Sequence, residues 1–352
     1  MLAVKRNVPL SGLNTMGVEG LAAAVVTWTT PGDLQEFFSP SSPCADLARN
    51  ARAIGEGSNL LFVNNRFDGT LLLCDNCNVE TSLNGEEVIL TVGAGMKLDT
   101  LVQKCVENNF WGIENLALIP GTVGAAAVQN VGAYGVEFGS LVTEVECFDR
   151  LTGKTITIQA RDIHYGYRNS IFKHSPAKER YIITAVTVRL SMVAAPNLSY
   201  GNLRAKLGDS PSIADIYTTV CETRRFKLPE VSETGSAGSY FKNPVVTDDI
   251  LEKVYRHADE LSIARETIPV FPVNLPDGSK AHKLSAAWLI DRSGWKGVKE
   301  GNVGTWPSQP LVIVNLSGKA TGREVEDLAT RILDDVYSKW NVRLVPEVEY
   351  IY

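Results

Sequence analysis

The residue types best suited to chemistry gather in glycine-rich segments. "GEGSN", residues 55–59, directly follows an apolar, strand-like run. Its backbone N–H groups could surround a pyrophosphate, as in other anion-binding turns. The next residues are "LLFV" and not the amphipathic helix of a Rossmann fingerprint, so that fold is excluded here. A tight hairpin turn without a ligand is the alternative.

A second segment, "IPGTVGAAAVQNVGAYG" at residues 119–135, is rich in glycine and alanine and carries no charge. Surface loops usually carry charge, and core helices rarely contain so much glycine. We expect something flat and large to lie against this backbone, with the amides of Gln129 and Asn130 at its polar edge. A tightly packed structural loop is the alternative.

A third segment, "GSAGSYFKNP" at residues 235–244, places Ser239 after small residues and before bulky ones. The small residues leave the hydroxyl accessible to a ligand. A hydroxyl is a weak acid and protonates only a strongly basic carbon or nitrogen.

The sequence gives no support for a metal site. Cys74 and Cys77 form one CxxC pair with no second pair to complete a zinc site, and ordinary thiols beside a strand are the simpler interpretation. The histidines show no ligand spacing; they are His164, His174, His257 and His282.

Composition narrows the classes of partner. The chain has 352 residues, 44% of them apolar, and a formal charge of −6 without a basic run. We therefore do not expect nucleic acid as a partner. The N-terminus lacks the apolar stretch of a signal peptide, and the longest apolar runs are too short to span a bilayer. We expect a cytoplasmic protein with no membrane partner.

Strands and helices must position these segments. From about residue 50, β-rich runs alternate with glycine turns, mostly as hairpins. Helical spacing predicts helices in residues 98–106, 212–227 and 324–340. "SMVAAPNLSY", residues 191–200, interrupts the pattern and predicts a domain boundary. The fold class is α+β.

Six motifs in order resemble the UDP-N-acetylenolpyruvoylglucosamine reductase (MurB) family, from "NTMG" at Asn14 onward. They are "GEGSN", "GIENLALIPGTVGAAAVQNVGAYG", "YGYRNSIFK", "GSAGSYFKNP", "KLSAAWLID" and "PEVEYI". The resemblance implies a flavoenzyme of peptidoglycan precursor synthesis, in which NADPH reduces FAD and FAD reduces the enolpyruvyl ether of a UDP-sugar to UDP-N-acetylmuramate.

The same resemblance implies an FAD-binding fold of the PCMH, or vanillyl-alcohol oxidase, type over residues 15–195, made of two subdomains that divide near residue 70. A C-terminal α+β substrate-binding domain then covers residues 200–345, and residues 346–352 return as a strand to the active site. We expect a monomer. The residues that match the family's FAD contacts are Gly55, Glu56, Gly57, Ser58, Asn59, Leu60, Ile119, Pro120, Gly121, Val123, Gly124, Gln129, Asn130, Gly132, Ala133 and Arg224.

Three positions match the family's catalytic residues. Arg168 would hold the substrate carboxylate as it gains charge, since a guanidinium fork fits a carboxylate. Glu347 would donate a hydrogen bond from its acid form, and Ser239 would protonate the enolate-like carbon.

Substrate contacts are implied at positions spread along the chain: Tyr134, Tyr167, Tyr200, Lys227, Asn243, Lys296 and Gln309. Tyr200 matches the tyrosine that marks the first of the family's two structural types. One departure is the triplet Ala125, Ala126 and Ala127, where several relatives carry Ser-Ser-Pro, so side-chain hydrogen bonds to FAD are not expected there.

Two alternatives stay open from the sequence. One is a flavin oxidase of the same fold that acts on an alcohol or a lactone, which would not need Tyr200, Lys227 and Gln309 together. The other is a protein that binds flavin or a UDP-sugar without catalysis. Such a protein would not need Arg168, Ser239 and Glu347 intact.

Overall fold

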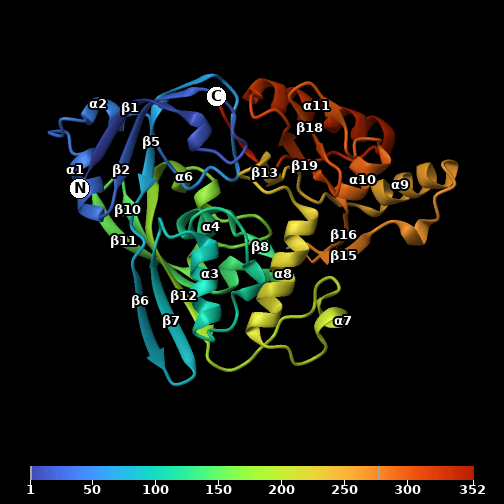
Figure 1. The fold of residues 1–352 in the computed structure, drawn as a ribbon, viewed down its shortest axis with the longest axis horizontal. Helices are drawn as coiled ribbons and strands as arrows, with labels where there is room; N and C mark the ends of the chain where they lie inside the picture. Colours follow the sequence, from blue (N-terminus) through green and yellow to red (C-terminus); the bar gives the residue numbers. More distant parts are fainter. Residues whose placement is uncertain (1, 276–277) are drawn as a thin grey trace. The chain divides into compact units, whose positions relative to one another are not determined.

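The computed structural model describes residues 2–275 and 278–352. Its contacts separate two compact units, each built from several stretches of the chain (Figure 1). The first unit contains the N-terminal residues up to Val8, Ala22–Glu56 and Asp68–Arg224. The second unit contains Pro9–Leu21, Gly57–Phe67 and Arg225–Tyr352.

One sheet of the first unit has the strand order β1-β2-β5-β3. Its strands are β1 (Ala3–Pro9), β2 (Leu21–Trp28), β3 (Ala51–Ile54) and β5 (Arg66–Cys74), and β3 runs parallel to β5. Helix α1 (Pro31–Phe38) starts at a capping box between Thr30 and Asp33 and buries Leu34 and Phe37; the short α2 (Ala45–Ala48) follows.

The other sheet of this unit is antiparallel, in the order β11-β10-β12-β7-β6. Its strands are β6 (Val79–Asn84), β7 (Glu87–Gly93), β10 (Val142–Asp149), β11 (Lys154–Gln159) and β12 (Tyr181–Ser191). Helices α3 (Leu98–Glu107), α4 (Val123–Gln129) and α8 (Ile213–Lys227) share one hydrophobic core with this sheet (Figure 1). Shorter elements of the unit are η2 (Glu114–Leu116), β8 (Gly132–Ala133), β9 (Val136–Glu137), η3 (Phe138–Ser140), α5 (Ala160–Ile163), η4 (Ile171–Lys173), α6 (Ala177–Arg180) and α7 (Leu203–Leu207).

The second unit has its own sheets and helices. One sheet has the order β13-β19-β18-β17, with β13 (Gly235–Ser239), β17 (Lys299–Glu300), β18 (Val303–Trp306) and β19 (Gln309–Asn315). Another has the order β14-β16-β15, with β14 (Val245–Val246), β15 (Val270–Asn274) and β16 (Lys280–Leu284). The helices are η1 (Leu10–Gly12), α9 (Asp248–Glu260), η5 (Arg265–Thr267), α10 (Ala286–Arg292) and α11 (Gly322–Trp340). The small parallel sheet of β4 (Leu60–Phe62) and β20 (Glu349–Ile351) also belongs to this unit.

The structure confirms the predicted helices as α3, α8 and α11, and it rules out the alternative of a hairpin at residues 55–59. The strands on either side of this turn do not pair with each other, because β3 pairs with β5 and β4 pairs with β20. The turn therefore joins strands of different sheets. The division after residue 195 stays a prediction, and α8 packs in the core of the first unit.

An ion pair between a buried carboxylate and a half-exposed arginine holds the end of β10 in the first unit. Asp149 is only 1% exposed and accepts two hydrogen bonds from Arg180, at 2.9 and 2.7 Å. Leu151 N and Thr152 Oγ1 donate to the same carboxylate, each at 3.0 Å. The hydrogen bonds from Arg180 are the main cause of an Asp149 pKa well below its usual range.

We predict that Arg180→Met lowers the free energy of unfolding by about 3 kcal/mol at pH 7, because it leaves a buried carboxylate unpaired. A lowered folded-state pKa contributes stability above the unfolded pKa, about 4, and this contribution is lost as the pH falls through the folded value. The deficit of the variant should therefore shrink at pH 3. Urea unfolding at both pH values measures it, with Arg189→Met as the control at an exposed ion pair with Glu87. An equal deficit for both variants would contradict the argument.

Candidate active site

The first two residues of the 55–59 turn pack against the other glycine-rich segment inside the first unit. A Cβ on Gly55 would lie 2.9 Å from both Ala125 Cβ and Thr122 Oγ1, so only glycine fits there. The Glu56 carboxylate accepts the N–H of Gly121 at 2.8 Å and pairs with Lys97 at 2.8 Å. Two segments predicted separately as cofactor contacts therefore lie together.

The rest of this turn belongs to the second unit. Gly57 has φ +66°, and a Cβ there would overlap the carbonyl oxygen of Leu13. Asn59 donates from its amide to the carbonyl of Glu347 at 3.1 Å, and its own carbonyl accepts from Glu349 N at 3.0 Å. Ser58 lies between Gly57 and Asn59, and Leu60 follows Asn59. The side chain of Asn59 thus fixes the segment that carries Glu347, just before β20.

Helix α4 and its flanks form most of the segment at residues 119–133. Gly124 approaches Ala94 so closely that a Cβ would lie 2.8 Å from the alanine Cβ. Ala126 and Ala127 are 3% and 0% exposed and belong to the hydrophobic core, so these two positions face the core in this chain. This explains how the alanine triplet is tolerated.

The amides predicted at the polar edge of this segment already have protein partners. Asn130 has φ +48° and is fully buried; its Nδ2 donates to Glu137 and Gly166 at 3.0 and 2.7 Å, and its Oδ1 accepts from Gly139 N at 2.8 Å. Gln129 Oε1 accepts from Lys173 Nζ. Both side chains therefore brace the loop. The other predicted residues of the segment lie in three places. Ile119 and Pro120 precede α4, Val123 begins α4, and Gly132 and Ala133 form the short β8.

Arg224 is placed beside this segment from helix α8. Its Nη2 donates to the carbonyl of Leu118 at 3.3 Å. Burial lowers the pKa of the guanidinium, and burial raises the pKa of Tyr134, to which the Arg224 charge is close. A half-buried cation next to residues 119–133 is suited to an anionic ligand.

Arg168 lies against the same segment, also within the first unit. Its Nη2 donates to the carbonyl of Gly132 at 2.7 Å, and its guanidinium carbon lies 5.3 Å from the centre of the exposed Tyr167 ring. Its backbone has φ +53°, a left-handed conformation that costs a non-glycine residue about 1–2 kcal/mol. Reciprocal backbone bonds between Gly166 and Asn169, at 3.1 and 2.9 Å, enclose it in a tight turn.

The sequence analysis missed Lys173, which joins Arg168 to helix α4. Its ammonium donates to the carbonyl of Arg168 at 3.2 Å as well as to Gln129. A lysine six residues beyond a tyrosine in "YRNSIFK" has no distinctive signal, because only the fold brings it back toward the helix.

Ser239 and Glu347 lie on neighbouring segments of the second unit. Ser239 is the exposed last residue of β13, after a register shift in its pairing with β19. Gly238 has φ +68°, and a Cβ there would meet open space, whereas Tyr240 is fully buried. Glu347 N donates to the carbonyl of Tyr240 at 2.8 Å. The accessible serine and the half-buried glutamate are therefore held beside the same backbone.

The predicted substrate residues are spread over several elements. In the first unit, the rings of Tyr134 and Tyr200 meet edge to face with their centres 6.3 Å apart. In the second unit, Asn243 Oδ1 accepts from Ala286 N at 3.0 Å and so fixes the start of α10. The remaining positions lie at element ends or in loops: Lys227 ends α8, Lys296 pairs with Asp291 at 3.3 Å, and Gln309 begins β19.

Metal-binding and membrane-spanning features are absent from the described residues. Over residues 2–275 and 278–352, no cluster of His, Cys, Asp and Glu side chains is arranged to hold a metal ion. No helix in that part of the chain has the length and apolar character to cross a membrane. Cys74 and Cys77 are free thiols, and burial raises the pKa of Cys74 to about 11, which disfavours the reactive thiolate.

Known proteins resemble the chain over nearly its whole length. The family model for the UDP-N-acetylenolpyruvoylglucosamine reductase C-terminal domain matches residues 230–351, and an FAD binding domain model matches residues 22–159. A UDP-N-acetylenolpyruvoylglucosamine reductase of Porphyromonas gingivalis is 39% identical over 357 residues, which cover 99% of each chain. The chain belongs to the UDP-N-acetylenolpyruvoylglucosamine reductase family.

Other relatives agree with this family. A reductase of Salmonella typhimurium is 36% identical, covering 96% of this chain and 94% of that one. The crystal structure of the Thermus caldophilus enzyme matches all of both chains with a TM-score of 0.68 at 25% identity. An FAD-binding domain followed by a MurB C-terminal domain is therefore the fold, as the resemblance implied.

The residues of the first unit fit the FAD that this family binds. Only glycine fits at Gly55 and Gly124, because a Cβ would collide with a protein neighbour, and the half-buried guanidinium of Arg224 lies near Leu118. A half-buried cation beside a glycine-rich turn is suited to the pyrophosphate of a dinucleotide.

Proposed function

We propose that this chain reduces the enolpyruvyl ether of UDP-N-acetyl-3-O-(1-carboxyvinyl)-glucosamine to UDP-N-acetylmuramate, with NADPH as co-substrate. Ser239, Arg168 and Glu347 are assigned as the catalytic residues. Bound FAD would supply hydride transfer between NADPH and the terminal carbon of the enolpyruvyl group. The rest of the chemistry falls to side chains of this chain.

Arg168 binds the substrate carboxylate. Negative charge grows on this carboxylate and on the neighbouring carbon as the terminal carbon is reduced. A planar guanidinium matches the two carboxylate oxygens, and a strained loop tied by Lys173 restricts its position. Such a donor stabilises the developing charge by about 3 kcal/mol, by analogy with oxyanion donors.

Ser239 then gives its proton to the carbon beside the carboxylate. The acceptor is a carbanion equivalent, so a well-placed hydroxyl is acidic enough. Glu347 donates a hydrogen bond from its acid form to the same charge. The observation that carries this assignment is the bond from Glu347 N to the carbonyl of Tyr240, the residue after Ser239.

Cofactor and substrate contacts complete the proposal. The turn at residues 55–60, the segment at 119–133 and Arg224 are assigned to FAD. The UDP-sugar is assigned to Tyr134, Tyr167, Tyr200, Lys227, Asn243, Lys296 and Gln309. The proposed domains cover residues 15–195 and 200–345, followed by residues 346–352; the matched ranges 22–159 and 230–351 support a division between the first two.

The setting of the enzyme is part of the proposal. The substrate and NADPH are small cytoplasmic metabolites, so we place the reaction in the cytoplasm. The net charge of −6 gives no reason to expect nucleic acid as a partner. A monomer is proposed, and light scattering of the purified protein measures this directly.

Steady-state kinetics test the reaction itself. The purified protein should be yellow, release FAD and not FMN, and consume NADPH only when the enolpyruvyl UDP-sugar is present. NADPH-independent oxygen consumption with an alcohol or a lactone would indicate the oxidase alternative. A yellow protein inert toward all of these substrates would indicate a binding protein.

Glu347→Gln should retain activity lowered by only about 10-fold, since the amide still donates a hydrogen bond. Glu347→Asp should lose more, because the shorter side chain withdraws the donor from the substrate. Stopped-flow reoxidation of reduced flavin by the UDP-sugar measures both variants. Abolished activity in the Gln variant with partial activity in the Asp variant would overturn the assignment.

A further inference from the structure

Glu347 lies two residues before β20, which is shorter than the strand expected at residues 346–352 and belongs to an unusually small sheet. Parallel strands β4 and β20 have three residues each and form a two-stranded sheet. Such a pair is marginally stable by itself. Something else in the second unit must hold this strand if Glu347 is to keep a fixed position.

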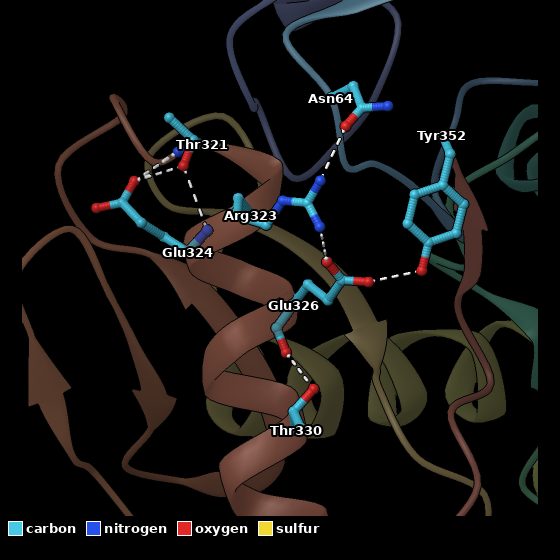
Figure 2. A network of polar contacts seen from close by, with 7 residues as sticks. All are labelled: Asn64, Thr321, Arg323, Glu324, Glu326, Thr330 and Tyr352. Atoms are coloured by element: carbon cyan, nitrogen blue, oxygen red, sulfur yellow. Dashed lines mark hydrogen bonds and ion pairs between the residues drawn. The ribbon is translucent and has the colours of Figure 1, made fainter.

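A polar circuit ties both strands to helix α11 (Figure 2). Tyr352, directly after β20, donates from Oη to Glu326 Oε1 at 2.6 Å. Arg323 donates to Glu326 Oε2 at 3.1 Å and to Oδ1 of Asn64 at 3.1 Å, just after β4. Figure 2 shows Arg323 between Asn64 and Glu326, with Tyr352 on the other side of the glutamate. The ends of both strands therefore meet on one turn of α11.

The first turn of α11 is a rigid base for this circuit. A capping box joins Thr321 and Glu324. Gly322 lies against the carbonyl of Phe62 in β4 so closely that a Cβ would overlap that oxygen. The side chain of Glu326 is only 15% exposed, which strengthens its charge-assisted bonds.

A row of tyrosine rings leads from the circuit to the serine. The ring centres of Tyr352 and Tyr350 are 6.4 Å apart, and those of Tyr350 and Tyr240 are 6.2 Å apart. Tyr240 is fully buried, follows Ser239 in sequence and accepts the N–H of Glu347 through its carbonyl. Glu326 therefore lies at one end of a packed row that ends at Tyr240, whose backbone follows Ser239 and is hydrogen-bonded to Glu347 N.

We propose that Glu326 is a positioning residue: through Arg323 and the tyrosine row it fixes Glu347 relative to Ser239. This inference rests on the proposed catalytic roles of these two residues. It predicts that the circuit affects protonation of the substrate and leaves reduction of the flavin by NADPH unchanged.

Stopped-flow kinetics of the holoenzyme test the proposal. Glu326→Ala should slow reoxidation of the flavin by the UDP-sugar by about 10-fold, as expected for a lost supporting contact. Tyr352→Phe removes one hydroxyl and should slow flavin reoxidation by about 3-fold to 5-fold. This variant tests the proposal even if the alanine variant folds poorly. Glu326→Gln keeps an acceptor for Tyr352 and should recover most of the rate. Thr330→Ala is the matched control, because Thr330 Oγ1 bonds only the backbone carbonyl of Glu326 in this network (Figure 2).

A double-mutant cycle separates positioning from general damage. If Glu326 acts through Glu347, Glu326→Ala should add less than about 2-fold in a Glu347→Gln background. An equal slowing of both half-reactions, or a full 10-fold loss in that background, would overturn the proposal. If Glu347→Gln alone leaves reoxidation unchanged, the proposed role of Glu347 fails and this inference fails with it. If Glu347→Gln slows reoxidation and neither Glu326→Ala nor Tyr352→Phe does, only the positioning role is wrong.

Discussion

Ser239→Ala is expected to leave reduction of the bound flavin by NADPH within about 2-fold of the wild type, while reoxidation by the UDP-sugar falls by about 10³-fold to 10⁴-fold. The reason is the division of labour between the half-reactions. Hydride transfer from NADPH needs no proton from the serine. Reduction of the substrate stalls unless the enolate-like carbon is protonated.

Stopped-flow absorbance of the flavin measures the two half-reactions separately. Ser239→Cys keeps a proton donor at the same place and should recover part of the lost rate. Ser232→Ala, an exposed serine seven residues earlier, is the matched control and should leave both rates unchanged. Equal losses in both half-reactions for Ser239→Ala would refute a role in proton donation.

Local sequence could predict the helices that bury one face in the core, because their apolar residues recur at a regular spacing. Helix α11 places Val325, Leu328, Ile332 and Val336 in the core, and this spacing was visible in the chain. The alternative of a hairpin at residues 55–59 is wrong. Strand β4 pairs with β20, nearly 290 residues away, and no local pattern specifies so distant a partner.

The candidate site divides in a similar way. Gly55 and Gly124 could be recognised in the sequence. The structure gives the reason for glycine there, because a Cβ at either position would collide with a neighbouring residue. The supporting residues could not be recognised from sequence. Lys173 is informative only once the loop returns to α4, and the bond from Arg323 to Asn64 spans 259 positions. Such contacts form only in the folded chain. From the sequence alone, these residues would be interpreted as charged side chains exposed to solvent.

Arg168→Met is expected to lower kcat/KM for the UDP-sugar by about 10³-fold, because it removes both the charge and the planar fork that bind the substrate carboxylate. Arg168→Lys should recover about 10-fold of this loss and no more, since a lysine supplies a point charge without the paired N–H groups. The lysine also cannot reproduce the geometry of the bond to the carbonyl of Gly132. Arg161→Met, at an arginine whose side chain is 85% exposed, is the matched control and should be silent. Flavin reduction by NADPH should stay near normal in all three variants. Full recovery by lysine would mean that charge alone suffices, and the assigned carboxylate fork would then be wrong.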